Sequence, residues 1–212
     1  MNSFWDLFKP EELIRYGGKF LLLSVIFLEN GVFFGFFLPG DSLLFTAGLL
    51  CYLGVLDMEL MPLILWIAAS AMGGYYAGYI FGLKTGDALY NKPDTLFFKK
   101  KYITTAEDFY KKYGGLALVM GRFLPIVRTF APILAGIVRV KPIIFLGYNV
   151  LGAILWPSVI VTAGYYVGKI FPNALDYLDF IVIGFILVTS LPIINNWRKD
   201  KKKKKEENSS YL

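Results

Sequence analysis

Two arginines inside an apolar stretch are the residues of this sequence with the clearest chemical potential. Residues 121–138 read GRFLPIVRTFAPILAGIV and place Arg122 and Arg128 among apolar side chains. A guanidinium at bilayer depth is costly, so it normally faces a partner or a cavity. Two guanidiniums together also form a permanently charged, planar clamp for a phosphate. The pair therefore predicts an anion site; the competing interpretation is that both arginines only neutralise buried acids.

Two acids upstream are the candidate partners of these arginines. Glu29 interrupts an apolar run, and Asp41 follows Pro39 and Gly40 at the start of the next run. Asp41 is also open to interpretation as an ordinary helix N-cap, whereas Glu29 has no such role. Burial and a nearby arginine act in opposite directions on the proton affinity of a carboxylate. Because the chain has no histidine, the two acids are the candidate proton carriers, with Glu29 ahead of Asp41.

The composition is that of an integral membrane protein. The 212 residues are 56% hydrophobic, and several apolar runs reach the ~20 residues that a helix needs to cross the bilayer core. With one cysteine and no histidine, the chain offers neither a thiolate metal cluster nor the usual catalytic base, so we expect no metal, no cofactor and no enzyme activity. The net charge of +6 favours a cytoplasmic membrane face over nucleic-acid binding.

Alternation of apolar and polar stretches divides the chain into segments. Residues 1–19 are expected to form an interfacial segment in which a helix starts near Pro10. The membrane core, 20–170, is expected to hold a hairpin at about 29–50, a span at 62–83, a cytoplasmic amphipathic loop at 84–114, a second hairpin at about 115–138 and a span at 142–168. A C-terminal span at 174–194 and a basic tail at 195–212 follow. Because lysines are concentrated in the 84–114 loop and the tail, we expect the C-terminus to be cytoplasmic.

An internal repeat relates the two halves of this core. The pattern Leu-Trp, seven residues, Gly-Tyr-Tyr begins at residue 65 and again at residue 155, and a Phe-Leu-Pro element precedes each copy, at 37–39 and 123–125. The two copies are expected to cross the membrane in opposite directions, which is the inverted repeat of many secondary transporters. The glycines next to the tyrosines predict close helix packing; they are Gly73, Gly74, Gly78, Gly164 and Gly168.

Each Phe-Leu-Pro element breaks an apolar run near its middle. An arm of about ten residues rises only ~15 Å, half of the bilayer core. We therefore interpret each element as a re-entrant hairpin, broken at Pro39 and Gly40 in the first and at Pro125 in the second. The tips are expected to meet near the midplane, where the two acids face the two arginines. The alternative is one simple span at 20–38 followed by a short span at 43–56. The predicted class is all-α, a polytopic membrane protein with two inverted repeats, each a re-entrant helical hairpin followed by a transmembrane helix.

These motifs resemble the DedA family of bacterial inner-membrane proteins, whose core is the VTT domain. The resemblance covers roughly residues 20–168 and rests on Glu29 with FLPGDS at 37–42, YG at 113–114, GRFLPIVRT at 121–129, AG at 135–136, and Asn149 with Gly152 and Trp156. It implies two re-entrant hairpins, an embedded acid pair at Glu29 and Asp41, and an essential arginine pair at Arg122 and Arg128. The family is associated with transport driven by the proton-motive force and with envelope integrity. Some members recycle undecaprenyl phosphate, and eukaryotic relatives scramble phospholipids.

The resulting hypothesis is a proton-coupled transporter of an anionic lipid phosphate in the bacterial inner membrane. Undecaprenyl phosphate, moved to the cytoplasmic leaflet, is the best candidate substrate; membrane lipids and protons are the other expected partners. Two alternatives stay open: a proton-coupled exporter of drugs, cations or other small molecules, and an uncoupled phospholipid scramblase. The sequence leaves the oligomeric state open.

Overall fold

The computed structural model describes residues 10–32, 35, 38, 40–90, 110 and 113–171, without the side chains of 10–17, 87–90, 125 and 126. The chain divides into two units, Met1–Lys169 and Ile170–Leu212, and only the first two residues of the second unit are described. Five predicted features lie wholly or partly outside the described residues. They are the first nine residues of the interfacial segment at 1–19, the span at 174–194, the tail at 195–212, the break residue Pro39 and most of the loop at 84–114.

Helices make up every described element, which confirms the predicted all-α class. They are α1 (Pro10–Gly31), α2 (Gly40–Tyr52), α3 (Leu60–Tyr90), α5 (Leu116–Gly121), α6 (Pro125–Ile137) and α7 (Pro142–Ile170). Among the described residues, two helices are long and apolar enough to cross a membrane, and they belong to α3 and α7. With 13 residues each, α2 and α6 rise about 20 Å, which is less than the roughly 30 Å hydrocarbon core.

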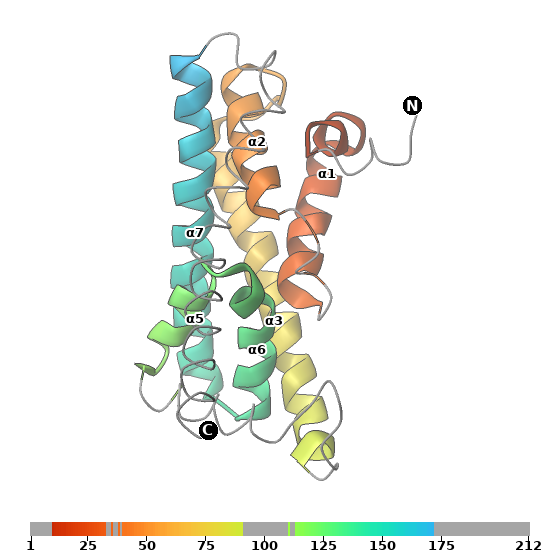
Figure 1. The fold of residues 1–212 in the computed structure, drawn as a ribbon, viewed down its shortest axis with the longest axis vertical. Helices are drawn as coiled ribbons and strands as arrows, with labels where there is room; N and C mark the ends of the chain where they lie inside the picture. The colour runs from red at the N-terminus through yellow and green to blue at the C-terminus, as the bar shows by residue number, and fades with distance from the viewer. Residues whose placement is uncertain are drawn as a thin grey trace, which may run out of the picture. The chain divides into compact units, whose positions relative to one another are not determined.

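The shorter helices form two pairs that approach each other from opposite ends of α3 and α7 (Figure 1). α1 runs to about the middle of the long helices, and α2 returns toward the end from which α1 came. α5 and α6 repeat this arrangement from the other end. The two breaks, between α1 and α2 and between α5 and α6, therefore lie at similar heights along the long helices.

The observed helix bounds stand beside the expected segments as follows. α5, α6 and α7 fall close to the predicted 115–138 and 142–168. α1 begins at Pro10, where the sequence predicts a helix start, and it continues through Glu29, whose carboxylate is paired with Arg128. It ends at Gly31, so residues 20–38 do not form one helix. The backbone bends at Gly18, whose φ of 56° is readily adopted by glycine.

Glycines bring the helix backbones into contact. A Cβ at Gly164 of α7 would overlap the backbone of Phe45 in α2, and a Cβ at Gly136 of α6 would overlap the backbone of Tyr79 in α3. A Cβ at Gly74 of α3 would likewise overlap α1. α2 therefore packs tightly on α7, while α6 and α1 pack tightly on α3. This is the small-residue packing that the glycine pattern predicts.

Candidate functional site

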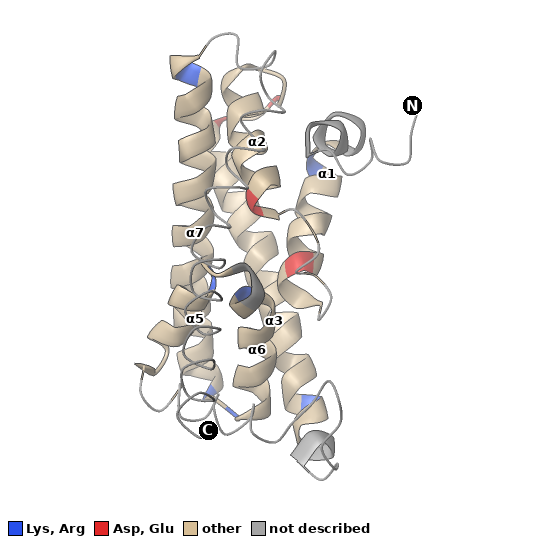
Figure 2. Ribbon diagram, in the orientation of Figure 1, with Lys and Arg blue, Asp and Glu red and all other residues tan. Residues whose placement is uncertain are grey.

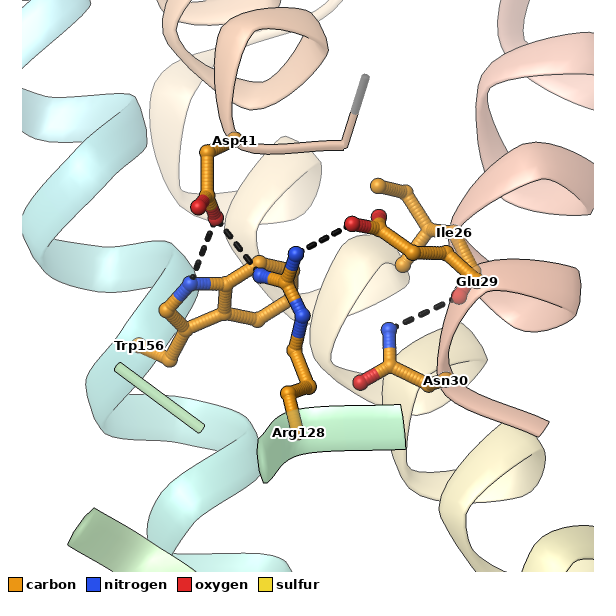
Figure 3. A network of polar contacts seen from close by, with 6 residues as sticks. All are labelled: Ile26, Glu29, Asn30, Asp41, Arg128 and Trp156. Carbon is orange, nitrogen blue, oxygen red and sulfur yellow. Dashed lines mark hydrogen bonds and ion pairs between the residues drawn. The ribbon is translucent and has the colours of Figure 1, made fainter. Parts of the chain in front are cut away.

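Arg128 lies between two carboxylates (Figure 3). Its Nη1 donates to Asp41 Oδ1 at 2.6 Å, and its Nη2 donates to Glu29 Oε1. The side chains of Arg128 and Glu29 are 2% and 0% exposed, and that of Asp41 is 20% exposed. Each acid takes one nitrogen of the same guanidinium, so the arginine ties the end of α1 to the start of α2. Two ionised acids would leave this group of three with one net negative charge.

The break between α1 and α2 places the two acids side by side. Glu29 lies in the last turn of α1, and Asp41 lies in the first turn of α2, where the helix dipole favours an acidic side chain. Gly40 separates them at a point of close approach, because a Cβ at this position would overlap the carboxylate of Glu29. Next to Glu29, the buried Asn30 donates from Nδ2 to Ile26 O at 2.8 Å within the same helix (Figure 3).

Trp156 of α7 contacts both partners of one of these ion pairs (Figure 3). Its indole Nε1 donates to Asp41 Oδ1 at 3.1 Å, and the Arg128 Cζ lies 4.6 Å from the centroid of its ring. The first contact is a hydrogen bond to a charged group, and the second has the geometry of a cation–π interaction. Asp41 Oδ1 thus accepts from Arg128 and Trp156 at once.

Arg122, at the end of α5, has different neighbours. Its Nη2 donates to Asn149 Oδ1 at 2.5 Å, and its Cζ lies 3.8 Å from the centroid of the Tyr75 ring. Asn149 Nδ2 in turn donates to Met72 O at 3.1 Å. The Arg122 side chain is fully buried, and its Nε and Nη1 have no hydrogen-bond partner within the part of the chain that the structure describes. Buried polar groups are normally paired, so these two donors are what an anion would satisfy.

The structure brings together three of the four predicted site residues, namely Glu29, Asp41 and Arg128. Arg122 differs from the expectation, because its described contacts are with Asn149 and Tyr75 and include no carboxylate. The reason is its place at the end of α5, between α3 and α7, whereas Arg128 lies one turn into α6 and reaches α1 and α2. Two of the three predicted break residues are described, and each begins a helix: Gly40 begins α2, and Pro125 begins α6.

Three side chains that contact the arginines were not assigned a role from the sequence. Tyr75 entered only as part of the repeated Gly-Tyr-Tyr pattern. Trp156 entered through the repeat and the family pattern, and Asn149 entered through the family pattern alone. A usable signal was present for Asn149, since it is the single amide in the apolar stretch 142–168. The shared Leu-Trp motif does not distinguish Trp156 from its repeat counterpart Trp66, which is 58% exposed while Trp156 is 1% exposed.

The described charges fall into two groups (Figure 2). One group lies toward the ends of the helices. The other lies near the two breaks: it holds the ion pairs of Arg128, where α1, α2 and α6 meet, and Arg122 at the end of α5. Charges inside an otherwise apolar region mark functional sites in membrane proteins more often than they stabilise the fold.

Comparison with known proteins finds one family over most of the described chain. The sequence pattern of the VTT domain matches residues 38–166. Protein DedA of Escherichia coli strain K12 is 38% identical over 172 residues, which cover 81% of this chain and 78% of that protein. Inner membrane protein YqjA of the same strain is 34% identical over 82% of this chain and 77% of its own length, and inner membrane protein YghB is 39% identical over 69% and 66%. No solved structure matches the chain.

Proposed function

We propose that this chain, which belongs to the DedA family of VTT-domain membrane proteins, moves a lipid phosphate across the membrane. The relatives named as inner membrane proteins support a location in the bacterial inner membrane. In this proposal α1–α2 and α5–α6 are the two re-entrant hairpins of an inverted repeat, and α3 and α7 are the spans that follow them. The substrate is an anionic lipid, with undecaprenyl phosphate as the leading candidate.

The single observation that carries the proposal is the state of Arg122. It is a fully buried guanidinium without a carboxylate contact among the described residues, and two of its nitrogens lack hydrogen-bond partners there. An arginine that only balanced a buried acid would be expected to contact one, as Arg128 does. A phosphate oxygen offers Arg122 the charge and the acceptors that the surrounding side chains do not.

The two arginines then have different roles. Arg122 receives the phosphate first, while Arg128 is held by Glu29 and Asp41. Protonation of one of these acids weakens its bond to Arg128 and frees a nitrogen for the same phosphate. The lipid tail stays in the bilayer beside the hairpins throughout. Because both guanidiniums are buried in this conformation, entry and exit of the headgroup require the helices to move.

A leaflet-access assay tests the proposal directly. The purified protein is reconstituted into liposomes that contain undecaprenyl phosphate in both leaflets, and a phosphatase is added outside. Without transport only outer-leaflet lipid is hydrolysed; with the wild-type protein the inner-leaflet lipid is expected to follow. Arg122→Lys is expected to abolish this second phase, whereas Arg139→Lys, a matched change at an exposed arginine, is expected to keep it.

Binding to the matched lipid undecaprenol separates phosphate recognition from recognition of the tail. Native mass spectrometry is expected to show undecaprenyl phosphate retained by the wild type and lost from Arg122→Lys, with undecaprenol retained by neither. Equal retention of both lipids by the wild type would refute phosphate recognition. With a pH gradient imposed across the liposomes, a transport rate that stays the same when a protonophore is added would identify an uncoupled scramblase. Movement of cationic compounds in place of the lipid would identify an exporter.

A further inference from the structure

Three residues on one face of α7 lie against the two buried arginines. Asn149, Gly152 and Trp156 are spaced three and four residues apart, so they project from the same side of the helix. Asn149 and Gly152 lie against Arg122, and Trp156 lies against Arg128. We call these three residues the α7 cradle.

Asn149 has a fixed orientation. Its Nδ2 donates to the backbone oxygen of Met72 in α3 at 3.1 Å, which directs the amide oxygen toward Arg122. The side chain is fully buried, so it has no competing water contacts at the surface. Because the Asn149 amide is uncharged, it holds the guanidinium in place without neutralising its charge. It accepts from Nη2, which leaves Nε and Nη1 as donors.

Gly152 provides the space in which the Arg122 side chain lies. A Cβ at this position would lie 2.8 Å from Arg122 Cδ and 3.0 Å from Arg122 Nε. Both distances are shorter than an ordinary carbon contact of about 3.5 Å. An alanine would therefore push the guanidinium away from its bond with Asn149. Gly147, on the same helix, has open space where a Cβ would lie and makes a matched control.

Trp156 orients Arg128 in two ways. Its Nε1 donates to Asp41 Oδ1, the same oxygen that accepts from Arg128, and so holds this carboxylate in place. Its ring face lies against the guanidinium. The repeat places Trp66 of α3 at the corresponding position, and Trp66 is 58% exposed. The role of Trp156 thus comes from its neighbours and not from the repeated motif.

We infer that the α7 cradle positions the guanidiniums of both arginines for one anionic headgroup, which makes Asn149 and Trp156 positioning residues of the site. This inference rests on the proposed function for its transport consequences. Its structural part, the shared contact of Trp156 and Arg128 with Asp41, is independent of any substrate. One helix thereby fixes the orientation of two charges that are supplied by α5 and α6.

The first test uses the indole of Trp156 as a spectroscopic reporter. In protein labelled with ¹⁵N-tryptophan, the indole resonance of Trp156 is identified by its loss in Trp156→Phe. This resonance is expected to shift in Asp41→Asn, which removes the charge of the acceptor, and to stay in place in Arg139→Lys. A resonance that is unchanged in Asp41→Asn would overturn the cradle, whatever the protein transports.

The second test measures transport in matched pairs of variants. Gly152→Ala and Trp156→Phe are each expected to slow inner-leaflet hydrolysis about tenfold, the equivalent of one lost hydrogen bond to a charged group. Gly147→Ala and Trp66→Phe are expected to match the wild type. Alanine is the better helix former, so Gly152→Ala should not lower helix stability. Wild-type rates in both cradle variants would overturn the inference. A wild-type protein that moves no lipid phosphate would overturn the proposed function. In that case the indole shift alone would show whether Trp156 and Asp41 are in contact.

Discussion

Replacing Arg128 by lysine tests whether a guanidinium is needed to hold two carboxylates at once. Arg128 presents Nη1 to Asp41 and Nη2 to Glu29 from a rigid, planar group. A lysine keeps the positive charge but concentrates it on one nitrogen at the end of a flexible stem, so it cannot reproduce the two directed contacts. It also loses the flat surface that lies 4.6 Å from the Trp156 ring.

The size of the effect follows from what remains buried after the substitution. A hydrogen bond to a charged group contributes about 1.5–3 kcal/mol, and removing one partner of a buried ion pair costs about 3–5 kcal/mol. Because lysine retains the charge and one contact, we expect the free energy of unfolding to fall by an amount near the lower end of these ranges, about 2 kcal/mol. For a chain of this length that corresponds to a fall in melting temperature of about 4–8 °C. The same 2 kcal/mol added to the transport barrier would slow transport about 30-fold.

Two measurements on the same preparation check this reasoning. Thermal unfolding is followed by size-exclusion chromatography of heated samples, and transport is followed by the leaflet-access assay. Arg139→Lys controls for the chemistry of the change at an exposed arginine. An Arg128→Lys protein with wild-type melting and wild-type transport would refute the claim that both carboxylates depend on one guanidinium.

Three further predictions address the rest of the site. Gly40→Ala places a methyl group on the carboxylate of Glu29, so it should lower the melting temperature and transport together; wild-type behaviour in both assays would show that the carboxylate has room to move. Tyr75→Leu removes the ring whose centroid lies 3.8 Å from Arg122 Cζ. Loss of a cation–π contribution of about 1 kcal/mol should weaken retention of undecaprenyl phosphate about fivefold in native mass spectrometry. Tyr75→Phe keeps the ring and should retain the lipid. Reversing the pH gradient across the liposomes should change the rate of inner-leaflet hydrolysis, and a rate independent of the gradient would contradict proton coupling.

Much of the helical framework was predictable because strong local signals mark its boundaries. Pro125 both breaks the apolar run and begins α6, and Pro142 begins α7. Long apolar runs bounded by charged loops predicted α3 and α7 to within several residues. In the first half the first hairpin was expected to begin at about residue 29, whereas α1 continues through Glu29, which is paired with Arg128, to Gly31.

The partners of the arginines were harder to predict, because each contact joins residues that are distant in the sequence. Glu29 and Arg128 are 99 residues apart, and Arg122 and Asn149 are 27 apart. The residue types allowed either arginine to contact either acid. Only the packing brings the Arg122 side chain against an aromatic ring of α3 and an amide of α7. The chemical difference between the two arginines is therefore a property of the packing and not of the motif.

The packing also bears on which parts of the molecule move. In the inverted repeat that we propose, the two sequence copies would rock against each other. However, α6 of the second copy is in backbone contact with α3 of the first, and α2 of the first is in backbone contact with α7 of the second. Helices that touch through glycines resist sliding because any shift drives backbone atoms together. We therefore expect α1, α3 and α6 to move as one body and α2 and α7 as another. The bond from Arg128 to Glu29 lies within the first body, whereas its bond to Asp41 crosses between them. Opening the site then breaks the contact with Asp41 and keeps the contact with Glu29, so a reversible cross-link between α2 and α6 should stop transport while one between α1 and α6 should not.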